Sequence, residues 1–124
     1  MPEAESSYKK GLAGEDRACE YLEKKGMVLL ERRYRSLYGE IDLVMQDGEI
    51  LVFVEVKARK NSRYGTGLEA ITLGKQKRLL QTAALYLAQT GHNAPVRFDA
   101  VEVMPEGITH IANAFEASGA EGFA

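Results

Sequence analysis

Apolar and polar residues change their spacing along the chain, and each spacing predicts a different kind of element. Residues 8–25 carry apolar side chains at helical spacing, and the glycine that follows, Gly26, predicts where this helix ends. Residues 72–90 repeat the pattern before Gly91 and predict a second helix. The residues expected to face the core are Leu12, Ala18, Cys19 and Leu22 in the first helix and Leu73, Leu80, Ala83 and Leu87 in the second.

Five shorter segments are rich in apolar and β-branched residues and predict strands. They are residues 27–35, 40–46, 49–59, 97–103 and, as a short last strand, 108–112. The order is helix, three strands, helix, one or two strands, αβββαβ(β), which predicts an α/β fold with a mixed central sheet flanked by helices. The length of 124 residues predicts one domain, 1–124, with an ordered core at about residues 8–116 and a frayed end at 117–124.

The predicted hairpin at the centre of the chain brings acidic residues together. Asp47-Gly48 is a strong signal for a two-residue turn, and it fixes the expected register. Counting back from this turn pairs Asp42 with Phe53. The same count pairs Glu40 with Glu55. Because side chains alternate between the two faces of a strand, Asp42 and Glu55 become diagonal neighbours on one face, close enough to ligate one divalent ion.

This face of the hairpin would be unfavourable without a cation. Three carboxylates packed together repel one another, and one of them would tend to keep its proton. A metal ion removes that repulsion, and Lys57 on the same face removes part of it. The alternative is a solvated outer face with alternating charges, but Leu51 and Phe53 share the face and favour a covered one.

Two polar residues interrupt the apolar stripes of the helices. Glu15 lies in line with the core positions of the first helix, and Gln76 lies in line with those of the second. A carboxylate is rarely buried unless it is paired or bound to metal, so Glu15 is a candidate site residue. Glu40 and Gln76 are secondary candidates. The alternative for both helical residues is a boundary position whose polar head reaches water.

The net charge of −2 does not favour nucleic-acid binding, but the charges are segregated along the chain. From Val56 to Leu80 seven basic residues are opposed only by Glu69, whereas no lysine or arginine follows Arg97. These residues are either a solvated basic face or a nucleic-acid contact. The candidates for that contact are Arg59, Lys60, Arg63, Lys75, Lys77 and Arg78.

Compartment and membrane association are constrained by simple counts. No apolar run approaches the ~20 residues that cross a bilayer, so we expect no membrane contact. The single cysteine, Cys19, excludes an internal disulfide, and the polar start of the chain lacks a signal peptide, so we expect a cytoplasmic protein.

The residues of the hairpin resemble a known signature. Residues 39–44, with Asp42, followed by residues 52–59, with Glu55-Val56-Lys57, are similar to the restriction-endonuclease-like superfamily, whose signature is an Asp, a short gap and Glu-x-Lys on the next strand. Ile41 stands where the older form of the signature has proline. More closely, the chain resembles the YraN-like family of small bacterial proteins of uncharacterised function, from Gly11 to about Glu116. That resemblance includes Gly14-Glu15, Lys75-Gln76 and Arg97-Phe98-Asp99.

The resemblance implies a set of roles. Asp42 and Glu55 would ligate Mg²⁺ or Mn²⁺ together with the backbone carbonyl of Val56. Lys57 would orient the attacking water and offset charge in the transition state. Glu15 is similar to the first-helix acid of archaeal Holliday-junction resolvases in the same superfamily.

The function implied is a metal-dependent, structure-selective endonuclease acting on DNA in repair or recombination. Its products would carry 5′-phosphate and 3′-hydroxyl ends, and analogy with resolvases implies a homodimer. Two alternatives stay open: a nuclease fold that binds nucleic acid without cutting it, and a small partner of a DNA-processing complex.

Overall fold

The computed structural model describes the backbone of residues 3–59 and 71–115, and the side chains of these ranges from residue 13 onward. The elements, in chain order, are α1 (Glu3–Lys24), β1 (Val28–Ser36), β2 (Gly39–Asp47), β3 (Ile50–Ala58), α2 (Leu73–Thr90), β4 (Val96–Met104) and β5 (Gly107–Ile111). The predicted order and the mixed α/β class are confirmed, although α1 begins five residues earlier than its apolar pattern indicated.

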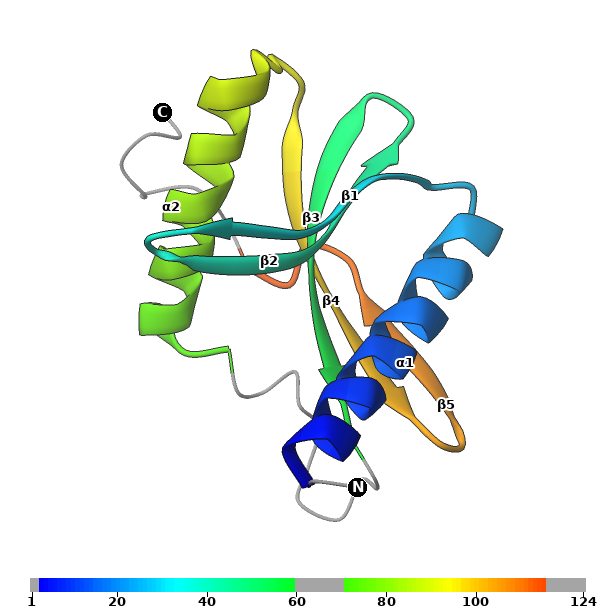
Figure 1. Ribbon diagram of the computed structural model, residues 1–124. Coiled ribbons are helices and arrows are strands. Elements are labelled where there is room, and N and C mark those ends of the chain that lie inside the picture. The colour runs from blue at the N-terminus through cyan, green and yellow to red at the C-terminus, as the bar shows by residue number, and fades with distance from the viewer. Residues whose placement is uncertain (1–2, 60–70, 116–124) are drawn as a thin grey trace.

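One five-stranded sheet runs in the order β1-β2-β3-β4-β5. Neighbouring strands are antiparallel except β3 and β4, which are parallel because α2 carries the chain from one end of the sheet to the other. The two helices lie on opposite sides of the sheet (Figure 1). No helix among the described residues is long and apolar enough to cross a membrane.

Strand alternation divides the core into two apolar layers. Val52 and Val54 of β3 pack toward α1, whereas Leu51 and Phe53 pack toward α2. The layer beside α1 contains Ala18, Cys19, Leu22, Met27, Leu43, Met45, Val52, Val54, Val101 and Val103. The layer beside α2 contains Ile41, Val44, Leu51, Phe53, Leu79, Leu80, Ala83, Tyr86 and Phe98. Cys19 is therefore a core residue, as its position on the apolar stripe indicated.

One predicted core position is wrong. Leu73 is 82% exposed, because Thr72 caps α2 and accepts a hydrogen bond from the Lys75 amide through its hydroxyl at 3.2 Å. Leu73 is thus the first helical residue, and it lies before the helix meets the sheet. Apolar contact with the sheet begins at Leu79 and includes Tyr86, which the predicted stripe omitted.

The predicted hairpin register is also wrong, by two residues. Asp47 pairs with Ile50, so the two-residue loop consists of Gly48 and Glu49 rather than Asp47 and Gly48. Gly48 has a φ of 61° and takes the first central position, which glycine occupies in a type II′ turn. An even shift keeps the paired residues of β2, from Leu43 to Asp47, on their predicted faces.

The strands β2 and β3 pair only part of the way. Their ladder ends at Leu43 and Val54, so the predicted pairs of Asp42 with Phe53 and of Glu40 with Glu55 do not form. Beyond this point the β1–β2 hairpin separates from β3 and extends toward α2 (Figure 1). This separation opens the sheet at the residues that the sequence singled out.

Candidate functional site

Asp42 and Glu55 are the first residues beyond the last paired residues of β2 and β3. The Val56 amide has lost its strand partner here and donates instead to Asp42 Oδ2 at 2.7 Å. The alternation of β2 breaks at the same place, since Ile41 packs beside α2 whereas Leu43 packs beside α1. A carboxylate therefore takes the place of a backbone carbonyl at the point where the strands diverge.

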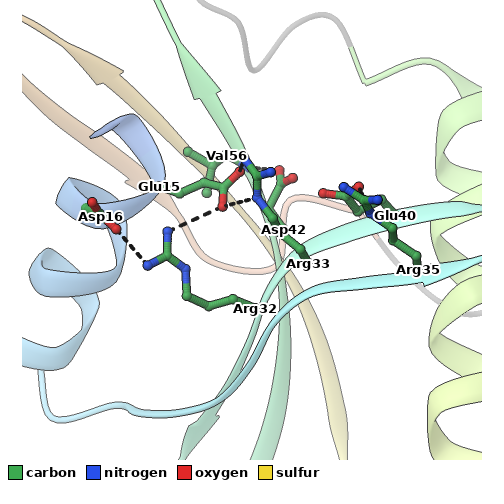
Figure 2. Close-up of polar contacts among 8 residues, drawn as sticks. All are labelled: Glu15, Asp16, Arg32, Arg33, Arg35, Glu40, Asp42 and Val56. Atoms are coloured by element: carbon green, nitrogen blue, oxygen red, sulfur yellow. Dashed lines mark hydrogen bonds and ion pairs between the residues drawn. The ribbon is translucent and has the colours of Figure 1, made fainter. Parts of the chain in front are cut away.

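Three carboxylates converge at this opening. Oxygen atoms of Glu15 from α1 and of Glu40 and Asp42 from β2 all lie within 4.8 Å of one another, and we call these residues the acidic cluster. Figure 2 shows the side chains pointing toward one another from the helix and the strand. Clustered carboxylate oxygens are the ligands that Mg²⁺, Mn²⁺ and Ca²⁺ prefer. The donor set therefore fits a hard divalent cation.

Asp42 is the member of the cluster whose charge is least compensated. It makes no ion pair with any lysine or arginine in the part of the chain that the structure describes. Burial and the neighbouring charge of Glu55 raise the pKa of Asp42 to about 7, with smaller contributions from Glu15 and Glu40 and an opposing one from the Val56 amide. Near neutral pH this carboxyl can hold a proton or exchange it for a cation.

Glu15 is buried and is fixed by arginines of β1. Arg33 donates from Nε and Nη2 to the two carboxylate oxygens, each at 3.0 Å, and Arg32 lies at 3.4 Å (Figure 2). Arg32 also pairs with Asp16 at 2.6 Å. Arg33 has a φ of 54°, a left-handed conformation that is costly for arginine, and this turn in β1 accompanies the two-pronged contact with α1. The carboxylate of Glu15 is therefore fixed in position by these arginines, at the edge of the cluster.

Replacing Arg33 with glutamine is expected to lower the free energy of unfolding by about 2 kcal/mol, because it leaves the buried Glu15 carboxylate with only the longer Arg32 contact. Urea unfolding at neutral pH measures the change. The control is Arg35→Gln, since Arg35 pairs with Glu40 at the surface at 2.9 Å and is expected to contribute under about 1 kcal/mol. Equal effects of the two substitutions would contradict a special role for the Arg33 contact.

Glu55 is neutralised by two lysines. Lys75 Nζ from α2 lies 2.5 Å from Glu55 Oε1, and Lys57 Nζ lies 3.7 Å from the same oxygen. The hydrogen bond from Lys75 is the largest cause of a lowered pKa at Lys57, and burial and the charge of Lys75 add to it. Burial disfavours the charged form of Lys75 and by itself would lower its pKa. The hydrogen bonds of Lys75 with Glu55 and Lys57 outweigh burial, so the pKa of Lys75 is raised. The structure thus places Lys75 beside the Glu-x-Lys motif.

The other predicted site residues fall in different places. Gln76 donates from its side chain to the Ile71 carbonyl at 3.1 Å and helps to close the start of α2. Arg59 lies 3.6 Å from Glu102. Lys77 and Arg78 are exposed on α2. Lys60 and Arg63 lie outside the described residues. The ligand role of the Val56 carbonyl stays a prediction.

Glu102 is a carboxylate that sequence reasoning missed. It is fully buried on β4 and stands in register with Lys57 of the parallel strand β3, so both side chains face the α2 side of the sheet. Its signal was a single charge inside the apolar run from Val101 to Val103. Glu102 adds negative charge on the strand next to Lys57, and Arg59 offsets part of it.

A second buried carboxylate, Asp99, belongs to a different cluster. Arg97 donates two hydrogen bonds to it at 2.8 and 3.0 Å, His110 lies at 2.7 Å and the Asn113 amide donates at 3.0 Å. Burial disfavours the charged form of Asp99 and by itself would raise its pKa. These hydrogen bonds outweigh burial, so the pKa of the Asp99 carboxyl is lowered. These contacts connect β4 with β5 and the residues that follow it, so we assign the cluster a role in stabilising the fold.

The mixed sheet with a helix on each face, opened at an Asp and a following Glu-x-Lys, is the arrangement of the restriction-endonuclease-like class. The chain belongs to the uncharacterised protein family UPF0102, whose profile matches residues 14–103, and this confirms the resemblance to the YraN-like proteins.

Relatives from distant bacteria share most of their length with this chain. A UPF0102 protein of Symbiobacterium thermophilum is 53% identical over 96 residues, which cover 77% of this chain and 81% of the relative. One from Janthinobacterium is 46% identical and covers 86% and 87% of the two chains, and one from Rhodococcus opacus is 44% identical and covers 85% and 94%. Their names carry the family designation and state no activity.

Proposed function

We propose that this protein is a metal-dependent endonuclease that hydrolyses phosphodiester bonds of DNA and prefers branched structures. The observation that supports this most directly is Asp42, a carboxyl without an ion pair among the described residues, between the other acids of the cluster and Glu55. An acid in this setting gains most from a divalent cation, because the cation relieves the repulsion that raises its pKa.

The residues present suggest how such a site would work. Asp42 and Glu55 would hold Mg²⁺ or Mn²⁺ with the Val56 carbonyl, and Glu15 or Glu40 would complete the oxygen shell. When bound, the ion supplies Lewis-acid stabilisation of the phosphate and of the attacking water. Lys57, whose pKa is lowered by the hydrogen bond from Lys75 and by burial, would orient the attacking water and offset charge in the transition state.

Contact with the DNA backbone would come from the exposed basic residues of α2. Lys77 and Arg78 are exposed on α2, two and three residues beyond Lys75. Such residues neutralise phosphates and give affinity that does not depend on sequence and that falls with salt. The described residues include no element suited to reading base edges, which favours recognition of DNA structure over sequence.

The test is a cleavage assay on a four-way junction, a flap, a bulged duplex and a linear duplex, each with Mg²⁺, Mn²⁺, Ca²⁺ or EDTA. We expect cuts that leave 5′-phosphate ends in Mg²⁺ or Mn²⁺, most on branched DNA, and none in EDTA. A Glu55→Ala protein purified in parallel is the control. Equal cleavage by both proteins would indicate a contaminating nuclease and would remove the assignment.

A second candidate is a protein that binds DNA without cutting it. The contact of Lys75 with Glu55 favours it, since an ammonium group at 2.5 Å already occupies an oxygen that a metal ion would need. Titration with Mn²⁺ followed by electron paramagnetic resonance separates the two. Retained DNA binding without bound Mn²⁺ would favour the non-catalytic protein.

A further inference from the structure

The turn between β1 and β2 exposes two large apolar residues. Ser36 pairs with Gly39, so Leu37 and Tyr38 form the whole of a two-residue turn. Leu37 is fully exposed and Tyr38 is 47% exposed. Neither residue has a positive φ, so the backbone accepts both, but turn residues in contact with water are usually polar. The turn geometry therefore permits a leucine and a tyrosine here but does not explain why both exposed positions are apolar.

The turn is held in place from within. Ser36 Oγ accepts a hydrogen bond from the Tyr38 amide at 3.0 Å and shares another, at 2.9 Å, with the buried hydroxyl of Thr82 on α2. Gly39 lies against the same helix, because a Cβ atom at this glycine would stand 3.9 Å from that of Arg78. The tip formed by Leu37 and Tyr38 is thus fixed relative to α2, so presenting it to a ligand costs little conformational entropy.

Basic side chains of α2 lie between this tip and Glu55, one of the candidate metal ligands. Lys75, Arg78 and Thr82 follow one stripe of α2, at helical spacings of three and four residues. Lys75 pairs with Glu55 at one end of the stripe, and Thr82 bonds to Ser36, beside the tip, at the other. Exposed positive charge at Arg78 therefore lies between the candidate metal ligands and the tip.

The distance between the two features suits DNA. Tyr38 precedes Asp42 by four residues of extended chain, which span about 13 Å at ~3.3 Å per residue. This is roughly the rise of four nucleotides in one strand of a duplex. A phosphate at the acidic cluster would thus put a base within a few nucleotides of the tip.

We propose that Leu37 and Tyr38 stack on an unpaired or unstacked base close to the cleaved phosphate. The inference rests on the proposed function and names its substrate class: DNA with a local break in base stacking, such as a bulge, a flap or a junction. Apolar side chains pack on exposed bases of any sequence, and wedges of this kind enter disrupted base steps. The adjoining arginine supplies the charge that phosphates attract.

A second copy of the chain fits the tip less well. Two side chains bury a few hundred Å² at most, whereas a stable dimer needs about 800 Å² from each partner. The flanking positive charge of Arg78 would also face its own copy in a symmetric dimer, and like charges repel.

The test uses a Glu55→Gln protein, which lets DNA be bound without being cut, and a duplex with 2-aminopurine as the unpaired base of a bulge. Leu37→Ser/Tyr38→Ser in this background is expected to weaken binding of the bulged DNA by about tenfold and to abolish the fluorescence change of the probe. Binding of linear duplex is expected to stay the same. The control is Leu73→Ser, an exposed leucine on α2 outside the tip, which is expected to alter neither signal.

Each other outcome overturns the stacking role. Unchanged binding of bulged DNA by the tip variant, with an unchanged melting temperature, would remove it. A fall in oligomeric mass of the tip variant in light scattering would assign the tip to a subunit contact. Equal binding of bulged and linear DNA by the parent protein would end this inference but leave the nuclease proposal intact, whereas no binding of any DNA would end both.

Discussion

Asp42→Asn is expected to stabilise the metal-free protein above pH 7 and to lower metal-dependent cleavage by at least about a hundredfold. Asparagine keeps an oxygen that accepts the Val56 hydrogen bond, so the local backbone contact survives. It removes the charge that faces Glu55, Glu15 and Glu40. A change that improves the fold while destroying the activity would identify Asp42 as a residue retained for function.

The pH dependence of this effect follows from the raised pKa. Folded Asp42 keeps its proton up to about pH 7, because of burial and then the charge of Glu55, whereas the unfolded carboxyl releases it near 3.8. Between these values the folded state binds more protons, so the free energy of unfolding of the parent protein falls as pH rises. The loss is at most about 4 kcal/mol, and solvent screening reduces the expected gain from asparagine to roughly 2 kcal/mol.

Urea unfolding in EDTA at about pH 5 and pH 8 measures the difference between the two proteins, which is expected to grow with pH. Mn²⁺ is expected to raise the melting temperature of the parent protein and to leave that of the variant unchanged. Glu40→Gln is the matched control, since Glu40 is paired with Arg35 and its loss is expected to change stability little. If the Asp42→Asn protein is less stable than the parent protein at pH 8 in EDTA, the inference that the charge of Asp42 is uncompensated is wrong.

The fold was largely predictable because its signals are local. Apolar periodicity located both helices and all five strands, and Gly26 and Gly91 marked the helix ends. The register was not predictable, since Gly48 can take either central position of a two-residue turn and both choices satisfy the same apolar pattern. The error did not change the faces of the paired residues, because a shift of two residues preserves alternation. The break in alternation between Ile41 and Leu43 was a separate feature that the strand pattern did not predict.

The candidate site was predictable only in part. The motif identified Asp42, Glu55 and Lys57, and the apolar stripe of α1 identified Glu15. The contact of Arg33 with Glu15 depends on a left-handed residue within a strand, which no local pattern signals for arginine. Contacts of this kind are set by tertiary structure, where strand, helix and turn meet.

The acidic residues of the site differ in how far nearby cations compensate their charge, which suggests that they have different roles. Arginines hold Glu15 on one side of Asp42, and lysines hold Glu55 on the other. Both pairs fix a carboxylate in the absence of metal, whereas Asp42 between them is held through one backbone amide. A metal ion must displace these flanking cations from the carboxylate oxygens of Glu15 and Glu55, so metal affinity should depend on how strongly the cations are bound. The contact of Lys75 with Glu55 is the shortest of these ion pairs.

Replacing Lys75 with methionine is expected to tighten Mn²⁺ binding by about tenfold and to lower the cleavage rate at saturating Mn²⁺ by a similar factor. Affinity rises because the ion no longer displaces an ammonium group from Glu55 Oε1, and cleavage falls because a cation is lost beside the phosphate. Electron paramagnetic resonance measures the first effect and single-turnover cleavage the second. Lys77→Met, on the same helix but exposed, is the control and is expected to weaken DNA binding without changing Mn²⁺ affinity. Weaker Mn²⁺ binding by the Lys75 variant would mean that this lysine supports the metal site instead of competing for it.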